Sequence, residues 1–252
     1  MKPVFRDDSS ANIEFGSSNG AWRFSDWVEE TIEELSAHAV CEVGGGAKPL
    51  LDGRAVAARG LDYVVADRSP SELGKARGAH ARVVADLGQE GFEPFGRFDL
   101  VCSRMVLEHV RNPRRFHENV WSLLRPGGVA LHFFSTLYDV PFLLNRVLPE
   151  NVVDRLLRAA QPNRQPDGDA AKFPALYRWC RGPTARQLRR LESTGFEVER
   201  YVGFFGHSYL ARVPPLQRLE DRWADLLLRH PTPWLTTFAW LRLRRPAWST
   251  AA

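Results

Sequence analysis

The feature that most constrains the fold is a short apolar run with an acidic residue at or next to its end, which occurs three times. The runs are AVCEV, DYVVAD and ARVVAD, at residues 39–43, 62–67 and 81–86. Two further apolar runs follow, at 97–103 and 129–135. Runs this short and this continuously apolar are typical of strands buried on both faces of a parallel sheet.

Helical patterns separate these runs. A helix is predicted to begin at Ser25, and another begins near Pro113 and ends at the Pro-Gly-Gly of 126–128. Alternating strands and helices predict an α/β fold with a doubly wound, mostly parallel, seven-stranded sheet of Rossmann-like type. In the last third, 184–206 predicts a helix and a strand. A further helix at 216–230 and a closing strand at 235–245, antiparallel at the sheet edge, complete the pattern.

The length of 252 residues favours one domain. Residues 1–20 are polar and lack a period, so we expect a flexible N-terminal arm before a single domain at 21–252. Apolar stretches broken by Pro149 predict a helical lid over the substrate at 137–175, inserted after the fifth strand of that sheet.

Composition narrows the class of protein. Hydrophobic residues make up 44% and charged residues 25% of the chain, as in folded globular proteins. Neither a signal-peptide pattern nor a membrane-length apolar run is present, so a cytoplasmic location is expected. The net charge is +4, and basic residues gather at 181–190 and 240–246. Such clusters are more often solvated surface than a binding site for an anionic partner. Three separated cysteines lie outside any CxxC pair and are predicted to stay reduced: Cys41, Cys102 and Cys180.

The first apolar run leads into the glycine-rich segment CEVGGGAKPLLD, at 41–52. A dinucleotide-binding GxGxxG motif would need a third glycine where Pro49 stands, and no GK[ST] of a phosphate-binding loop follows. Glycines there still let a ligand approach the backbone closely. Asp67, at the end of the next apolar run, is placed to accept hydrogen bonds from a ribose. The pattern therefore indicates a nucleoside ligand.

From about 40 to 136 the sequence resembles the class I S-adenosylmethionine-dependent methyltransferases. Five segments resemble the family's motifs in order: VCEVGGGA, VVADRSPSELGKA, VVADLG, FDLVCSRMVLEHVRNP and LLRPGGVALHFFST. The resemblance implies S-adenosylmethionine as cofactor and S-adenosylhomocysteine as product. Two departures, Lys48 and Pro49, predict that the first helix after the loop is short or irregular.

The resemblance also implies a role for each matching position. The methionine part of the cofactor would be held at Glu42, Gly44, Gly45 and Gly46. Asp67 would bind the ribose hydroxyls with Arg68 beside it, and Asp86 with Leu87 would bind the adenine. Ser103 and Arg104 would line the methionine side.

A general base near neutral pH is wanted, and His109 in the LEHV segment is the first candidate. The alternative is a histidine that packs structurally. In quinone-biosynthesis O-methyltransferases, which this stretch resembles, a Glu-x-x-Glu-His set binds magnesium. Glu108 and His109 match that set, but Met105 replaces its first glutamate, so Mg²⁺ is not favoured and Glu108 would orient His109 or cap a helix. His207 is the second candidate base.

The leading hypothesis for the function is O-methylation of a small hydroxylated bacterial metabolite, with a saccharide the favoured acceptor. A phosphorylated or lipid-linked acceptor is an alternative, and a peripheral contact with a membrane is compatible with either. Arginines that could grip such an acceptor are Arg178, Arg181 and Arg186, although solvation is the commoner outcome. Aromatic residues gather late in the chain, with a sheet core the favoured reading: Phe173, Tyr177, Trp179, Phe204, Phe205 and Tyr209. A nucleic-acid methyltransferase is disfavoured, because the fourth apolar run lacks a base-gripping Asn/Asp-Pro-Pro set. A non-catalytic cofactor-binding partner protein is the third reading, and both monomer and homodimer stay open.

Overall fold

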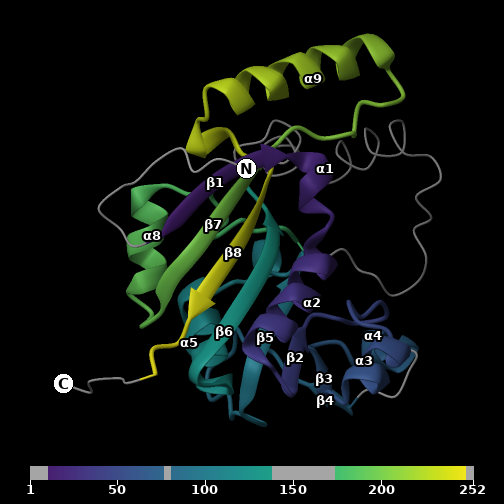
Figure 1. The fold of residues 1–252 in the computed structure, drawn as a ribbon, viewed down its shortest axis with the longest axis vertical. Helices are drawn as coiled ribbons and strands as arrows, with labels where there is room; N and C mark the ends of the chain where they lie inside the picture. Colours follow the sequence, from purple (N-terminus) through teal and green to yellow (C-terminus); the bar gives the residue numbers. More distant parts are fainter. Residues whose placement is uncertain (1–10, 77–80, 138–173, 248–252) are drawn as a thin grey trace.

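The structure is a computed structural model that describes residues 11–76, 81–137 and 174–247. Within these residues an eight-stranded sheet runs in the order β1-β7-β8-β6-β5-β2-β3-β4 (Figure 1). The strands are β1 Asn12–Ser17, β2 Ala39–Val43, β3 Asp62–Asp67, β4 Ala81–Val84, β5 Phe98–Arg104, β6 Leu124–Ser135, β7 Glu197–Phe205 and β8 Phe238–Arg244. The five predicted apolar runs are all strands, which confirms the doubly wound, mostly parallel fold.

Helices cover both faces of the sheet. They are α1 Ser18–Ala21, α2 Phe24–Leu35, α3 Gly53–Arg59, α4 Pro70–Lys75, α5 Pro113–Leu123, α8 Ala185–Glu192 and α9 Pro214–Arg229, with short turns η1 Leu107–His109 and η2 Pro233–Leu235. Apolar residues of α2, α3 and α4 pack in one buried cluster, and those of α5, α8 and α9 pack in the other. The sheet between the two clusters is therefore buried on both faces, as its continuous apolar strands require. No helix in the described part of the chain is long and apolar enough to cross a membrane.

Two features of the sheet correct the sequence-based expectation. The closing strand β8 is antiparallel as predicted, but it lies between β6 and β7 and not at the edge. The eighth strand, β1, comes from the predicted arm and pairs in parallel with β7. Its apolar side chains alternate, with Ile13 and Phe15 buried, and Glu14 accepts hydrogen bonds from Arg200 at 2.8 and 2.9 Å. Polar residues on either side of β1 hid this two-residue period in the sequence.

Two predicted segments lie outside the described residues. They are 1–10 of the N-terminal arm and 138–173 of the lid.

The basic cluster at 240–246 belongs to the sheet. Arg242 is only 8% exposed, and its guanidinium donates to Glu34 at 2.6 and 2.7 Å and to Glu199 at 2.6 Å. Arg244 also donates to Glu199. These arginines therefore neutralise acids of neighbouring elements, and little of their charge is left for a partner.

A pair of buried histidines lies between β6, α5 and the segment near Trp179. The imidazole rings of His117 and His132 are 5.4 Å apart between centroids, and both residues are at most 1% exposed. His132 Nδ1 is 2.7 Å from the Ser103 hydroxyl, whereas His117 Nδ1 and His132 Nε2 have no hydrogen-bond partner. Burial lowers the pKa of His117 to about 3 and that of His132 well below its ordinary value. Both rings are therefore neutral in the folded protein.

We expect His117 to make the fold sensitive to acid. Below pH 6.5 an unfolded histidine binds a proton that the folded ring refuses until about pH 3, so stability is lost as pH falls through this window. Relative to His117→Phe, the wild-type free energy of unfolding should fall by roughly 1 kcal/mol per pH unit. Denaturant unfolding at several pH values measures the difference, with exposed His230→Phe as control. Parallel pH curves for wild type and His117→Phe would contradict the buried neutral ring.

Candidate functional site

The glycine loop leaves β2 in a backbone conformation that favours glycine. Gly44 has φ +75° and Gly46 has φ +42°, both in the left-handed region. The Gly44 amide donates to the Ala66 carbonyl at 2.7 Å, which ties the start of the loop to β3. A Cβ atom on Gly44 would stand 2.3 Å from Val106 Cγ2, so a side chain there would collide with the segment after β5. Close packing of three strand ends therefore requires this glycine.

Glu42 fastens the far end of the loop. Its side chain is buried, and Oε2 accepts from the Leu50 amide at 2.8 Å and from the Tyr63 hydroxyl. Burial raises the pKa of Glu42 to about 6, against the opposing effect of these two hydrogen bonds. Glu42, which was predicted to bind the methionine part of the cofactor, therefore fixes the conformation of the glycine loop.

Arg104, at the end of β5, reaches the middle of the same loop. Its guanidinium donates to the Lys48 carbonyl at 3.3 Å, and its charge opposes the rise in the pKa of Glu42. The loop is thus held from β3 and from β5 at once. Beyond Lys48 the chain stays irregular until Asp52, whose side chain accepts from the amides of Arg54 and Ala55 and starts α3. With seven residues α3 is short, as the Lys48-Pro49 departure predicts.

Asp67 ends β3 beside the bare backbone of Gly46. Its Oδ1 accepts from the Ser69 amide at 2.9 Å, and its Oδ2 lies 3.2 Å from where a Cβ on Gly46 would stand. Burial raises the pKa of this half-buried carboxyl group. The arrangement presents an acceptor oxygen next to a glycine, which suits a ribose diol. Arg68 is exposed on the next position of the chain.

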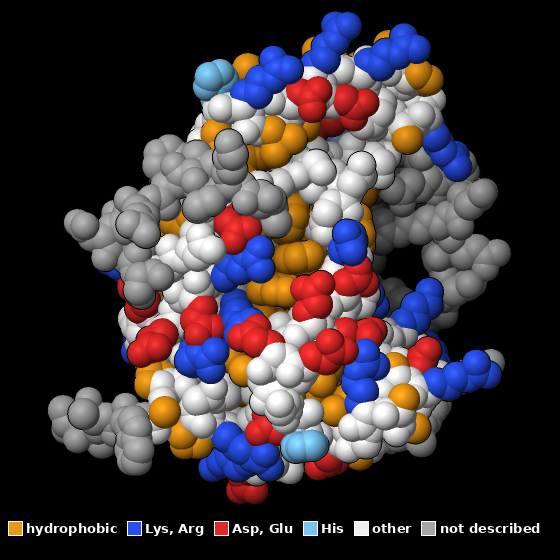
Figure 2. All heavy atoms as spheres, viewed as in Figure 1, with side chains coloured by type: hydrophobic (Ala, Val, Ile, Leu, Met, Phe, Trp, Pro, Cys, Tyr) orange, Lys and Arg blue, Asp and Glu red, His pale blue; other side chains and the backbone are white. Residues whose placement is uncertain are grey.

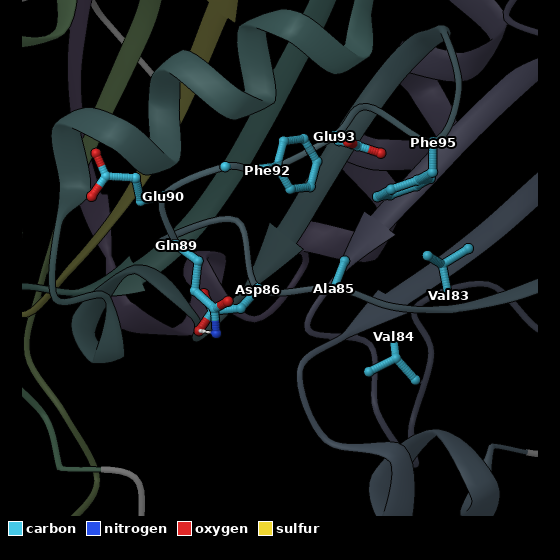
Figure 3. Close-up of a pocket in the computed structure, with 10 residues that line it drawn as sticks. Val83, Val84, Ala85, Asp86, Gln89, Glu90, Phe92, Glu93 and Phe95 are labelled. Carbon is cyan, nitrogen blue, oxygen red and sulfur yellow. Dashed lines mark hydrogen bonds between the residues drawn. The ribbon is translucent and has the colours of Figure 1, made fainter.

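A hollow of about 340 Å³ lies beyond β4, next to the predicted adenine residues (Figure 3). It is lined by Val83, Val84, Ala85, Asp86, Gln89, Glu90, Gly91, Phe92, Glu93 and Phe95. Asp86 Oδ1 accepts from the Gly88 amide at 2.8 Å, and Figure 3 shows its side chain beside Gln89. Leu87 is buried, and its carbonyl accepts from Asn119 of α5 at 2.8 Å. Apolar side chains and three carboxylates, those of Asp86, Glu90 and Glu93, form its walls, and the volume lies at the low end for ligand pockets.

Ser103 has its side chain in the core. Its hydroxyl is fully buried and bonded to His132, so the side chain belongs to the histidine pair. The sequence could not show this, because the partner is 29 residues away in the chain.

Glu108 also lies in the interior. Its Oε1 accepts from the Ser135 hydroxyl at 3.0 Å, and Oε2 is buried without a hydrogen-bond partner. Its backbone carbonyl accepts from the amides of Leu176 and Tyr177 at 2.6 and 3.0 Å. Burial raises the pKa of Glu108. The residue thereby fixes the segment after 173 to η1, a connection that sequence reasoning missed.

His109 follows on η1 with a partly exposed ring. Its Nδ1 is 3.4 Å from the Pro174 carbonyl oxygen. A carbonyl can only accept, so Nδ1 carries the proton in this contact and Nε2 keeps a lone pair. Nε2 is therefore the ring nitrogen that is left as a hydrogen-bond or proton acceptor.

His207 is placed differently. It is 7% exposed, its Nδ1 accepts from the Tyr209 amide at 3.3 Å, and its Nε2 is 3.6 Å from Glu220 Oε1 on α9. Burial lowers the pKa of His207. Its contacts join the end of β7 to α9, which is a structural role. Tyr177, Phe204 and Phe205 are likewise buried in the core.

Three arginines of the late basic segment differ in use. The Arg178 guanidinium donates to the Arg111 carbonyl at 2.8 Å, and that of Arg181 donates to the carbonyls of Tyr177 and Cys180 at 2.7 and 2.9 Å. Arg186 is exposed on α8. Two of the three therefore support the backbone of the segment that carries Pro174.

Met105 occupies the position at which the related magnesium site has a glutamate. It has φ +56°, and its amide donates to the Phe133 carbonyl at 2.7 Å. In the described residues, no group of three or more His, Cys, Asp or Glu side chains is arranged to hold a metal ion.

Trp22, just past α1, is a residue that the sequence analysis did not single out. Its ring is 58% exposed and packs edge-on against Phe133 at 5.3 Å and Phe238 at 5.6 Å. Phe133 lies near the end of β6, so this indole stands at the edge of the sheet that carries the glycine loop. Its signal was hidden because a lone tryptophan in a polar stretch has no periodic pattern.

Residues 16–201 match a protein-family model described as a methyltransferase domain. The chain belongs to this methyltransferase family. The methyltransferase is 29% identical over 181 residues to a ubiquinone biosynthesis O-methyltransferase of Leptothrix cholodnii, covering 66% of this chain and 72% of that protein. An uncharacterized methyltransferase of Mycobacterium sp. is 34% identical over 118 residues, which cover 46% of each chain.

Among solved structures, the N-methyltransferase NodS of Bradyrhizobium japonicum in complex with S-adenosylhomocysteine shares the fold. Its TM-score is 0.51 at 14% identity, over 91% of this chain and 89% of that one. The methyltransferase uses S-adenosylmethionine as cofactor. The bare glycine loop, the Asp67 carboxylate and the hollow at Asp86 fit the methionine, ribose and adenine parts in that order.

Asp67→Ala should weaken binding of S-adenosylhomocysteine by about 1 to 3 kcal/mol, because a ribose hydroxyl pair would lose its acceptor. Calorimetric titration measures this loss. Asp62→Ala is the matched control, since Asp62 is an exposed aspartate at the opposite end of the same strand. Equal affinity in both variants would remove Asp67 from the cofactor site.

Proposed function

We propose that the protein transfers a methyl group to a hydroxyl oxygen of a small acceptor, with His109 as general base. The observation that carries the proposal is the contact between His109 Nδ1 and the Pro174 carbonyl, which leaves Nε2 ready to accept a proton. The printed name of the Leptothrix relative, an O-methyltransferase, supports oxygen as the methylated atom.

The chemistry needs little from the protein beyond alignment and proton removal. Bound S-adenosylmethionine supplies a methyl group that is already activated toward nucleophiles. His109 Nε2 takes the acceptor proton as a new O–CH₃ bond forms and the C–S bond breaks, so charge and atoms balance. Arg104, Glu42 and Asp67 hold the loop and ribose side in place, which supports in-line geometry.

The acceptor class that we propose is a saccharide or a similarly hydroxylated metabolite. An exposed indole, Trp22, near the carboxyl end of β6 offers a broad apolar face to a sugar ring. The half-exposed His109 leaves room for such a ring to approach from solvent. Under this proposal Trp22 contacts the acceptor and makes no contribution to cofactor affinity.

His109→Ala should lower turnover by roughly a hundredfold, because the acceptor hydroxyl would lose its proton acceptor. Release of S-adenosylhomocysteine is first screened with sugars, sugar phosphates and phenols, and then measured with the best acceptor. His109→Ala should bind S-adenosylhomocysteine as tightly as wild type. Exposed His38→Ala serves as the matched control.

Two results would separate the alternatives. Unchanged turnover in His109→Ala would remove this histidine from the mechanism. Tight cofactor binding without turnover on any hydroxylated acceptor would favour the non-catalytic partner reading.

A further inference from the structure

The outer face of α9 carries a row of exposed apolar side chains. Leu216, Leu219, Trp223 and Leu226 are between 47% and 65% exposed. Their spacing of three, four and three residues places them along one stripe of the helix. The side of α9 that packs on the protein is a different one, where Ala224 and Leu227 are buried. We call these four residues the α9 stripe.

Arginines border the α9 stripe on the side away from the protein. Arg222 comes three residues after Leu219 and four before Leu226, and Arg229 comes three after Leu226, so both are neighbours of the stripe on the helix surface. Both are exposed. Figure 2 shows basic and hydrophobic side chains over this helix, with acidic side chains among them. By helical position the acids Asp221 and Asp225 lie beyond the arginines, farther from the stripe. Glu220 lies on the other flank of the stripe, where it faces His207 on the protein side.

This combination discriminates between possible occupants. An apolar row alone fits any hydrophobic partner. A neighbouring row of arginines favours a partner whose surface carries negative charge. A second copy related by a two-fold axis, with the two α9 helices antiparallel, would place the Arg222 and Arg229 row along the same row of its partner. Like charges there would repel. An anionic surface meets both rows favourably.

We propose that α9 is an interfacial helix that docks the protein on an anionic lipid surface. Helices that lie in the plane of a membrane interface carry Leu and Trp side chains on one face and basic side chains beside them, as the 16-residue α9 does. The α9 stripe enters the boundary between headgroups and acyl chains, and Arg222 and Arg229 bind lipid phosphates.

The position of α9 gives the docking a consequence. The helix contacts β1 and β7 and crosses the top of the molecule in Figure 1. His207, which follows β7, bonds to α9 through Gln217 and faces Glu220, so the helix is fixed to the carboxyl end of that strand. β7 runs parallel to β6, β5 and β2, so its carboxyl end lies on the same side of the sheet as the glycine loop, which follows the carboxyl end of β2. A docked molecule would hold its cofactor-binding edge toward the lipid.

Co-sedimentation with vesicles of phosphatidylcholine, with and without phosphatidylglycerol, tests this proposal. Wild type should pellet with the anionic vesicles and much less with the neutral ones, and added salt should weaken binding. Leu219→Ser/Trp223→Ser should abolish binding. Arg222→Glu/Arg229→Glu should weaken it by roughly tenfold or more. Arg186→Glu/Arg189→Glu is the matched control, since it makes the same charge change on exposed positions of α8 and should bind like wild type.

Titration with S-adenosylhomocysteine and a melting curve of each variant show that its fold and site are intact, so this test is separate from the transfer reaction. Absence of vesicle binding by wild type overturns the proposal. Equal losses in the α8 and α9 charge variants also overturn it, because net charge alone would then explain binding. A dimer that Leu219→Ser/Trp223→Ser dissociates, without vesicle binding, would assign the α9 stripe to a second copy instead.

Discussion

The buried carboxylate of Glu42 is the interaction on which the cofactor site depends. Glu42 is one residue before the end of β2. A single carboxylate oxygen, Oε2, accepts hydrogen bonds from the Leu50 amide and the Tyr63 hydroxyl. Leu50 closes the glycine loop and Tyr63 belongs to β3, so one group fixes the loop against two strands. Burial disfavours the charged carboxylate and raises the pKa of Glu42 to about 6. The two hydrogen bonds stabilise the charged form and offset part of this effect. A loop with bare glycines would otherwise have many conformations, because glycine loses the most backbone freedom on folding.

From this anchor the rest of the site follows through strand order. The parallel strands β2, β3, β5 and β6 bring their carboxyl ends to one edge, where the glycine loop, Asp67, Arg104 and η1 meet. The antiparallel β8 then allows β7 to run parallel to β6, so that the segments after β1 and β7 reach the same edge. Trp22 and α9 are therefore carried to the ligand side by strands far from the cofactor in sequence. The topology, and not local sequence, decides what can surround an acceptor.

The sequence predicted the parts of this arrangement that repeat a local pattern. Apolar runs located five strands, because each rests on neighbouring residues. The assignment of the glycines and Asp67 to the cofactor rests on the same kind of local pattern and stays a prediction. Strand β1 was missed because only Ile13 and Phe15 mark its period inside a polar stretch. The inner place of β8 was missed because pairing order is a long-range property. Ser103 was expected to line the methionine side and Glu108 to orient His109 or cap a helix. Their side chains bond to His132 and Ser135, partners that no local signal predicts.

The segment that holds His109 shows why local and distant requirements conflict at this site. Tyr177 and Trp179 both have left-handed backbones, at φ +49° and +60°, which non-glycine residues adopt only when their surroundings enforce it. The enforcement comes from several elements: the Glu108 carbonyl accepts from the Tyr177 amide, the Arg181 guanidinium donates to the Tyr177 carbonyl, and Gln187 of α8 donates to the Trp179 carbonyl. Pro174 lies at the start of this strained segment, and its carbonyl orients the His109 ring. The orientation of the His109 ring thus depends on backbone strain that the core of the domain maintains, and a sequence motif alone cannot specify it.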